Sequence, residues 1–270
     1  SSPSSGAEML ELSPGVRIQK SQGGGGSPVI RGFEANRVLI VVDGVRMNNA
    51  IYRSGHLQNS ITIDPSNIER AEIIFGSSSV GYGSDAMGGV IHYYTKNPIL
   101  KNSEKISSSF TTNFNSANNS VSNNFNTSLS SDNWGSITSI SIAKYGDIWM
   151  GKNRNHGFSD WGLNPIYSKN SRYSYYSEPS INSDNNIQRN TGYSQVDLFQ
   201  KFLVNLGDSS LLNLNIQFSE SSDIDRFDQL SIPKDNSLKY SEWYYGHQKR
   251  LLISQSLRVF PNKQFMDKGV

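Results

Sequence analysis

The sequence predicts a mixed α/β domain over residues 1–98, followed over residues 99–270 by about six antiparallel strands from the start of a transmembrane β-barrel. Two observations predict this division. The first part contains short apolar runs separated by turn dipeptides and a helical turn. The second part contains segments of about ten residues in which apolar and polar side chains alternate, as in barrel strands between lipid and a water-filled interior.

Three apolar runs predict strands in the first domain: residues 38–42, 71–75 and 90–95. The Asp-Gly dipeptide at 43–44 predicts a two-residue hairpin turn, which leads into residues 45–47. Asp64 and Pro65 predict a short helical turn, because Asp is a favoured N-cap and Pro fits the first helical position. The glycine run 23–26 predicts backbone that adopts positive φ or packs close to a neighbouring element.

Six two-faced segments are expected in the second part: residues 106–114, 121–129, 134–149, 196–206, 212–218 and 245–259. In the first of them, Ile106, Phe110 and Phe114 share one face, while Ser, Thr and Asn residues share the other. The alternation is poor in the third segment. A soluble antiparallel sheet with one face on a core has the same period, so this pattern alone allows a membrane barrel or a soluble sheet.

The lengths of the connections favour the barrel. Those at 131–133 and 206–209 are tight, whereas those at about 147–190 and 219–240 are long and polar. Long and short connections therefore alternate, as expected when one rim faces outward and the other faces the periplasm. The first connection, 116–120, departs from this rule because it is short on the rim where long loops are expected.

Composition limits the classes of function. The 270 residues carry 25 basic and 23 acidic side chains, a formal net charge of +2, without the basic stripe that nucleic-acid-binding proteins show. We therefore expect no nucleic-acid partner. Hydrophobic residues make up only 35% of the chain, yet 11% are aromatic, which favours one-faced strands over disorder. The sequence has no cysteine, which excludes disulfides and thiolate metal sites.

Four motifs follow one another in the first domain: VIRGF at 29–33, VLIVVDGVR at 38–46, IERAEIIFG at 68–76 and YGSDAMGGVI at 82–91. In this order and spacing they resemble the signatures of the plug domain of TonB-dependent outer-membrane receptors, over about residues 10–98. The sequences at 22–27, 47–59 and 243–250 further resemble the haem and haemoprotein branch of that family.

This resemblance implies a fragment of a 22-stranded plugged barrel in the Gram-negative outer membrane, in contact with its lipid. It also implies import of an extracellular iron complex, driven by TonB through an N-terminal segment that we expect to precede this chain. Haem or a haemoprotein is the favoured ligand, with no tightly bound cofactor. A siderophore, cobalamin or an oligosaccharide is the alternative ligand, and a secreted β-sandwich lectin or adhesin is the alternative class of protein.

Four charged residues are candidates to latch the plug to the barrel wall: Arg31, Glu69, Arg70 and Glu72. The resemblance implies that Arg and Glu side chains of the plug pair with the wall. Such pairs are partly desolvated, yet they can break when one partner is pulled and water enters. The alternative is a charged face that is simply solvated.

Two segments hold candidate ligand-binding residues. Tyr52, Arg53 and His56 lie between two plug strands, and the resemblance places them in an apical loop that faces the ligand. His56 is a candidate ligand of haem iron, although a lone loop His is more often just exposed. The long connection carries four further candidates: His156, Trp161, Tyr173 and Tyr175. Aromatic loops of this kind suit recognition of a large partner or a glycan, or form a collar at the membrane interface.

No nucleophile, base and orienting group occur at motif spacing in the sequence. Nucleophilic catalysis requires such a set within hydrogen-bond reach. We therefore expect no catalytic residue and no enzyme activity. We also expect no bound metal ion, apart from the iron of a transported haem.

Overall fold

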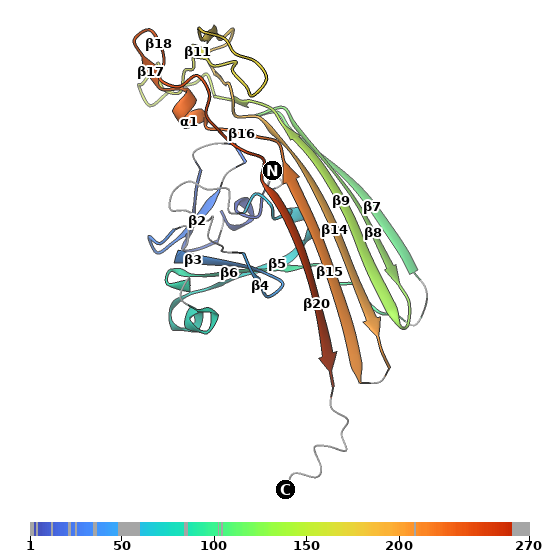
Figure 1. The fold of residues 1–270 in the computed structure, drawn as a ribbon. Helices are drawn as coiled ribbons and strands as arrows, with labels where there is room; N and C mark the ends of the chain where they lie inside the picture. Colours follow the sequence, from blue (N-terminus) through green and yellow to red (C-terminus); the bar gives the residue numbers. More distant parts are fainter. Residues whose placement is uncertain are drawn as a thin grey trace.

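A computed structural model describes residues 3, 5–11, 13–20, 23–24, 26–34, 37–47, 60–83, 86–101, 103, 105–207 and 209–260 (Figure 1). The chain forms a small domain built on a mixed sheet, called the N-terminal domain below. This domain lies against a large antiparallel sheet, called the wall (Figure 1).

The N-terminal domain is built on a four-stranded sheet in the order β4-β3-β6-β5. Its strands are β3 (Val38–Val42), β4 (Val45–Arg46), β5 (Ile68–Ile74) and β6 (Gly89–Thr95), and β1 (Val16–Gln19) pairs separately with β2 (Ser27–Ile30). β3 and β6 run parallel, whereas the other neighbours are antiparallel. The three strands predicted from apolar runs are confirmed.

The helices of this domain are shorter than a mixed α/β domain implies. In its described residues they are three 3₁₀ helices: η1 (Glu8–Leu10), η3 (Pro65–Asn67) and η4 (Gly76–Tyr82). The turn at η3 begins as predicted, with the Asp64 carboxylate accepting from the Ser66 N–H at 2.9 Å. It ends after one turn because Ile68 already has the extended backbone of β5. The described part of the domain is therefore mostly strands.

The predicted hairpin turn after β3 is confirmed. Asp43 and Gly44 have φ values of 48° and 84°, and Val42 pairs with Val45 across the turn. Positive φ at both central residues defines the type I′ turn, whose twist matches that of the flanking strands. This turn places the Asp43 side chain beside the wall.

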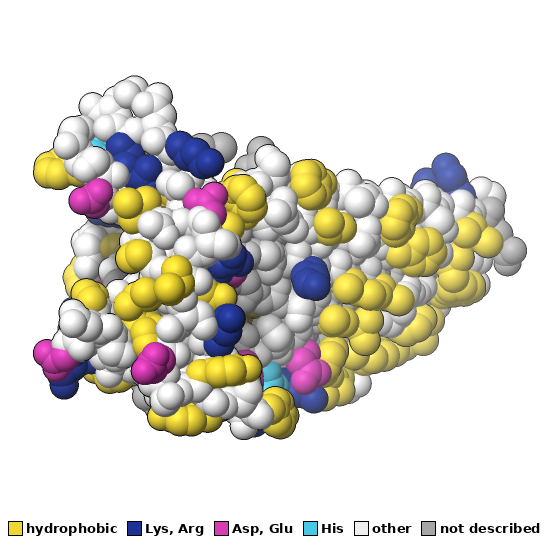
Figure 2. Space-filling view, turned by 90° about the horizontal axis from the view of Figure 1, so that it is seen from above, with side chains coloured by type: hydrophobic (Ala, Val, Ile, Leu, Met, Phe, Trp, Pro, Cys, Tyr) yellow, Lys and Arg dark blue, Asp and Glu magenta, His cyan; other side chains and the backbone are white. Residues whose placement is uncertain are grey.

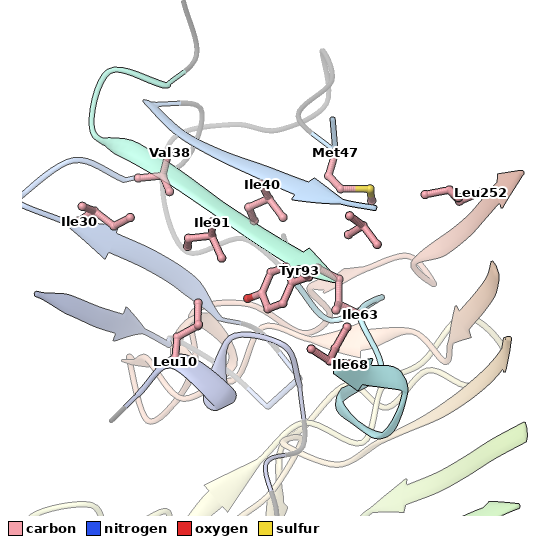
Figure 3. Close-up of a cluster of buried hydrophobic side chains, with 11 residues drawn as sticks. Leu10, Ile30, Val38, Ile40, Met47, Ile63, Ile68, Ile91, Tyr93 and Leu252 are labelled. Carbon is pink, nitrogen blue, oxygen red and sulfur yellow. The ribbon is translucent and has the colours of Figure 1, made fainter. Parts of the chain in front are cut away.

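The core of the N-terminal domain lies between its sheet and the segments that cover it (Figure 3). Its buried side chains are Leu10, Ile30, Val38, Ile40, Val42, Met47, Ile63, Ile68, Ile91, Tyr93 and Leu252. The Tyr93 hydroxyl donates to the Gly6 carbonyl at 2.8 Å, which satisfies the polar end of a ring that is otherwise fully buried. Leu252 belongs to the wall, so the two parts of the chain share one core.

The wall is a six-stranded sheet in the order β20-β15-β14-β9-β8-β7, and all neighbours are antiparallel. Its strands are β7 (Lys105–Asn115), β8 (Ser120–Ser130), β9 (Trp134–Tyr145), β14 (Tyr193–Asn205), β15 (Ser210–Ser221) and β20 (Lys249–Val259). Six strands lie where the sequence predicts them, but the sixth begins at Lys249 rather than at residue 245, because Tyr244 and Tyr245 form a separate strand. The third ends at Tyr145, because Ile148 and Trp149 form a separate strand, β10, that pairs with β13 (Ile187–Gln188).

The wall is polar on the face that meets the N-terminal domain and apolar on the other. One apolar row crosses all six strands in register: Phe110, Phe125, Ile140, Leu198, Phe218 and Leu251. The adjacent inward row is polar: Asn124, Ser141, Asp197, Ser219 and Arg250. Hydrophobic side chains lie in rows along the wall in Figure 2.

The two long connections form short strand pairs at one end of the wall, at the top in Figure 1. The first contains β10, β13 and the pair β11 (Ile166–Tyr167) with β12 (Ser180–Ile181). The second contains the pairs β16 (Ile224–Asp225) with β19 (Tyr244–Tyr245) and β17 (Pro233–Lys234) with β18 (Ser237–Leu238), and helix α1 (Phe227–Leu230). The short β7–β8 connection lies at this same end, as predicted. Within the described residues, no helix has the length and apolar character needed to cross a membrane.

Candidate functional site

The segment 60–67, called the strap below, runs across the polar face of the wall. Its polar atoms meet one strand after another: Asn124 of β8 donates to the Ser66 hydroxyl (3.1 Å), Ser141 of β9 to the Asp64 carboxylate (2.6 Å) and Arg250 of β20 to the Thr62 carbonyl (2.7 Å). These three wall residues belong to the inward polar row. The strap is therefore hydrogen bonded along a single row, over strands from β8 to β20.

Asp64 both shapes the strap and binds it to the wall. One carboxylate oxygen accepts from the Ser66 backbone N–H. The other accepts from the Ser66 hydroxyl (2.6 Å), the Asn67 amide (2.8 Å) and the Ser141 hydroxyl (2.6 Å). A carboxylate has about four acceptor sites, so these neutral donors satisfy it. The Asp64 carboxylate, which caps the helical turn before β5, therefore also binds the N-terminal domain to β9.

A second polar contact joins the β3–β4 turn to β14 and β15. Asp43 accepts hydrogen bonds from the Thr95 N–H (2.9 Å) and the Asn215 amide (2.9 Å), and its Oδ2 lies 3.3 Å from Lys201 Nζ. Lys201 is 2% exposed and also donates to the Thr95 hydroxyl (2.8 Å) and to Asn97 (2.9 Å). The buried ammonium is therefore compensated by an anion and two neutral acceptors, and removal of the anion would leave a buried charge without its counter-ion.

The glycine run packs directly against the wall. A Cβ at Gly23 would lie 2.1 Å from the Thr191 carbonyl oxygen, and a Cβ at Gly24 would lie 2.9 Å from the Tyr193 ring. Gly24 also has a positive φ of 70°. The Tyr193 ring is itself fixed, because it stacks on Tyr145 with the ring centroids 4.4 Å apart. The predicted close packing is confirmed at these two glycines.

The four predicted latch residues lie outside these contacts. Arg70 and Glu72 pair with each other on β5, Nε to Oε1 at 2.9 Å, and this hydrogen bond lowers the pKa of Glu72. Arg31 and Arg70 each lie over an aromatic ring of the same domain, and Glu69 is exposed. Within the described residues, none of the four is hydrogen bonded to the wall. Their role as a latch stays a prediction.

His92 of β6 is a buried histidine that accepts a hydrogen bond. Its Nε2 accepts from the Gly44 N–H at 3.1 Å. Burial lowers the pKa of His92, whereas the charges of Glu72 and Asp43 oppose that effect and Arg70 adds to it. The neutral ring is the form in which Nε2 can accept, so the lowered pKa and the hydrogen bond agree.

The predicted apical residues Tyr52, Arg53 and His56 lie outside the described residues. The segment that holds them joins β4 to the strap, whose wall contacts are described above. Their proposed contact with a ligand, and iron ligation by His56, stay predictions. Within the described residues, no group of three or more His, Asp or Glu side chains is placed to hold a metal ion.

The predicted ligand-binding residues of the long connection lie on two tips. His156 and Trp161 share one turn, with ring centroids 5.5 Å apart, and His156 Nδ1 accepts from the Phe158 N–H at 3.2 Å. The neutral ring therefore presents Nε2 as a donor, which suits an acceptor such as a carboxylate better than a metal ion. Tyr173 and Tyr175 lie on a second tip between β11 and β12, where they are 91% and 77% exposed.

Sequence patterns do not identify the strap or the Asp43–Lys201 contact. Lys201 carries the one available signal, a cation on the polar face of an amphipathic segment, which indicates a partner inside a barrel rather than a lipid contact. Asp64 signals only the start of a helical turn, because its wall partner is distant in sequence. Asp43 gives no signal of a wall contact, because the Asp-Gly turn motif by itself accounts for an Asp at this position.

Comparison with known proteins finds a family model that matches the N-terminal domain. Residues 1–90 match the family model described as TonB-dependent Receptor Plug Domain. A vitamin B12 transporter, BtuB, of Vibrio vulnificus is 43% identical over 90 residues, which are 33% of this chain and 14% of that protein. A hemin receptor of Yersinia pestis is 42% identical over 90 residues (33% and 13%), and a heme/hemopexin utilization protein C of Haemophilus influenzae is 38% identical over 119 residues (42% and 16%). The matches span less than a fifth of these relatives.

Solved structures extend the likeness to the wall. The ferric enterobactin receptor PfeA of Pseudomonas aeruginosa aligns with 96% of this chain and 36% of its own length, at a TM-score of 0.64 and 18% identity. The siderophore receptor PirA of Acinetobacter baumannii aligns with 83% of this chain and 30% of its own, at a TM-score of 0.54 and 18% identity. At such identities the likeness concerns the fold alone, namely a small domain seated on the polar face of a strand wall.

Proposed function

We propose, from the premise that residues 1–90 are a plug domain of the TonB-dependent receptor family, that this chain belongs to an outer-membrane receptor that imports an iron complex. The chain covers only a part of the receptors it resembles. The import activity, its ligand and its partners are therefore proposed for the whole protein.

The main support for this proposal is the polarity of the wall, which is apolar on its exposed face and polar on the face that meets the N-terminal domain. Its exposed face is apolar from β7 to β20, whereas its covered face is lined by polar side chains such as Asn124, Ser141 and Lys201. Strands with this pattern suit lipid on one side and a water-lined interior on the other. We place the apolar rows in the lipid of the Gram-negative outer membrane, and the long connections on the cell surface.

In this proposal the N-terminal domain is the plug, and the strap with the Asp43–Lys201 contact holds it against the wall. TonB acts on the plug from the periplasmic side, where the tight wall connections lie. Hydrogen bonds and ion pairs in a polar interior can be exchanged for water as the plug moves, which lowers the cost of breaking them. Polar contacts are thus suited to an interface that must open and close.

Haem or a haemoprotein is the proposed ligand. Two relatives are named for hemin and heme/hemopexin, and the residues proposed to meet the ligand are His56 in the apical segment and His156, Trp161, Tyr173 and Tyr175 on the surface tips. The donor presented by His156 suits a haem propionate. A siderophore or cobalamin is the second candidate, because other relatives are named for those ligands.

A growth assay with the whole receptor tests the proposal. The receptor gene is placed in a Gram-negative strain that cannot make haem and has no other haem receptor. Growth on hemin should require both the receptor and TonB. Parallel arms supply a ferric siderophore to an iron-starved host and cobalamin to a cobalamin-requiring host. TonB-dependent growth only in one of those arms would replace haem as the ligand, and growth in none would overturn the transport function.

A further inference from the structure

Charged side chains are rare on the outward, apolar face of the wall, and they lie only near the end that carries the long connections. Alternate residues of a strand share a face, so the outward row through Ile140 and Leu251 identifies the other outward residues. Within the six wall strands, the outward charged residues are Lys144, Glu220 and Lys249. Each is the outward residue of its strand that lies nearest the long connections. The rest of the outward face is therefore uncharged.

Lys144 differs from the other two residues because no acidic side chain compensates its charge. Lys249 Nζ lies 3.5 Å from the Glu220 carboxylate, so those two charges offset each other. Lys144 is exposed, and its cross-strand partners are the uncharged residues Val121 on β8 and Ser194 on β14. Among the described residues, no ion pair joins Lys144 to a carboxylate. One uncompensated cation therefore stands at this end of the outward face.

Ser194 adds a second donor beside Lys144. The two residues are directly opposite in the β9–β14 register, so their Cβ atoms lie about 5 Å apart on one face of the sheet. The backbone of Ser194 is held in place, because its N–H donates to the Ser222 hydroxyl at 3.0 Å and its carbonyl accepts from the Ser222 N–H at 2.9 Å. An ammonium group and a hydroxyl group at this separation can both donate to the oxygens of one phosphate.

Large apolar side chains surround this cation. Phe114 and Val121, in the same row on β7 and β8, are 67% and 39% exposed, and Ile142, one outward row further from the long connections, is 55% exposed. Trp149 is 48% exposed and lies beside the β7–β8 turn, because its N–H donates to the Ala117 carbonyl at 2.7 Å. Aromatic rings and a long cationic side chain at the edge of an apolar surface are typical of a membrane interface.

The position of the donors relative to the apolar rows favours an amphiphile over a free anion. A phosphate held by Lys144 and Ser194 would bring attached acyl chains over Ile142 and Ile140, which follow on the same face of β9. A free phosphate would leave that apolar surface unused. An exposed ion pair is weak by itself, so the acyl contacts supply most of the affinity and the phosphate supplies the selectivity.

We propose that Lys144 and Ser194 bind the headgroup phosphate of a phosphorylated lipid in the outer leaflet, with its acyl chains packed on Ile142 and the apolar rows beyond it. This inference rests on the proposed placement of the wall in the outer membrane, and it is independent of the ligand that the receptor imports. The bound headgroup holds β9 and β14 at a fixed depth in the leaflet.

The test uses the purified whole receptor in detergent, with native mass spectrometry to count bound lipid. The two probes are diphosphoryl lipid A and the same lipid with its phosphates removed. Lys144→Gln should bind the phosphorylated probe about fivefold or more weakly and the dephosphorylated probe as the parent does, because one cation near the headgroups is lost. Lys144→Arg should keep the affinity. Lys234→Gln, which removes an exposed lysine from the tip of the second long connection, is the matched control and should bind as the parent does.

The outcomes separate this inference from the proposed function. Equal affinity of the parent and Lys144→Gln for the phosphorylated lipid overturns the inference, and so does an equal loss in Lys144→Gln and Lys234→Gln. Displacement of the lipid by excess inorganic phosphate assigns the donors to a free anion and also overturns it. In each of these cases the proposed function stands if the parent supports TonB-dependent growth. A parent that does not fold into phosphatidylcholine vesicles refutes the membrane placement, and with it both the inference and the proposed function.

Discussion

At the scale of single residues, Asp43 serves a turn and an interface at once. Its positive φ completes the type I′ turn after β3, and its carboxylate meets Lys201, Asn215 and Thr95. Lys201 is shielded from bulk water, because it is only 2% exposed. The pair is therefore asymmetric, since removal of the anion strands a buried cation, whereas removal of the cation leaves a carboxylate with neutral donors.

We expect Asp43→Asn to lower the free energy of plug–wall separation by about 3–5 kcal/mol, because it leaves the Lys201 charge uncompensated. Asn tolerates positive φ, so the turn itself should persist. Lys201→Met should cost less, and the double variant should cost less than the sum of both. Chemical unfolding of the whole receptor, followed by a fluorophore on the plug, measures this cycle. Additive effects would show that the two side chains do not interact.

His92 predicts a pH dependence. Its pKa in the folded protein lies below the usual value, so the stabilisation it gives is present above a pH of about 6.5 and is lost as the pH falls through the lowered value. Protonation would also remove the acceptor for the Gly44 N–H. We expect His92→Gln to flatten the loss of thermal stability between about pH 7 and 5. Equal slopes in the parent and the variant, measured by differential scanning calorimetry, would contradict this.

At the scale of elements, the strap and the glycine run fix the plug in different ways. The strap uses hydrogen bonds to one polar row, which water can replace one at a time. The glycine run uses shape, because its backbone touches the wall where no side chain fits. The hydrogen bonds of the strap can therefore break and re-form, whereas the glycine run closes the gap between plug and wall only while their two surfaces fit together.

We therefore expect Gly23→Ala to loosen the seal. Its Cβ would lie 2.1 Å from the Thr191 carbonyl oxygen, so the loop must move, at a cost of about 1–3 kcal/mol. Cells that carry the variant should become more sensitive to vancomycin, which the intact outer membrane excludes. Gly81→Ala is the matched control, since its Cβ would meet open space at an ordinary φ. Equal sensitivity of both variants would refute a sealing role.

The strands could be predicted from the sequence, but their contacts could not. Period-two alternation identifies the wall strands because each residue's face depends only on its neighbours in sequence. The Asp-Gly turn and the Asp64 cap are local for the same reason. In contrast, the pairing of Lys201 with Asp43 depends on where an entire domain sits, and so does the fit of Gly23 against Thr191. The predicted latch residues had the right charges, yet the structure places Arg70 and Glu72 beside each other.

At the scale of the whole molecule, the wall presents its apolar rows outward and its polar rows to the plug. This order suits lipid, and it exposes large side chains that a water-soluble protein would cover. Both long connections lie at the same end of the wall, so the two ends of the sheet differ in the size of their loops (Figure 1). In the proposed receptor, the same sheet would therefore set both the contact with lipid and the direction of import.

The outward rows predict a depth-dependent effect of charge. Leu198→Lys places a cation near the middle of β14 and should cost about 2–4 kcal/mol when the whole receptor folds into lipid vesicles. Val259→Lys, at the end of β20, should cost about 0–1 kcal/mol. Urea titrations in vesicles measure both. Similar costs at the two depths would argue against a membrane around these strands.

The shared core has a consequence for biogenesis. Leu252 comes from the last described strand, yet it completes an interior built from residues synthesised far earlier (Figure 3). Until β20 is laid down, that interior keeps a gap that deprives its neighbours of contacts. In the proposed receptor, the plug core therefore reaches its final packing only after β20 has formed.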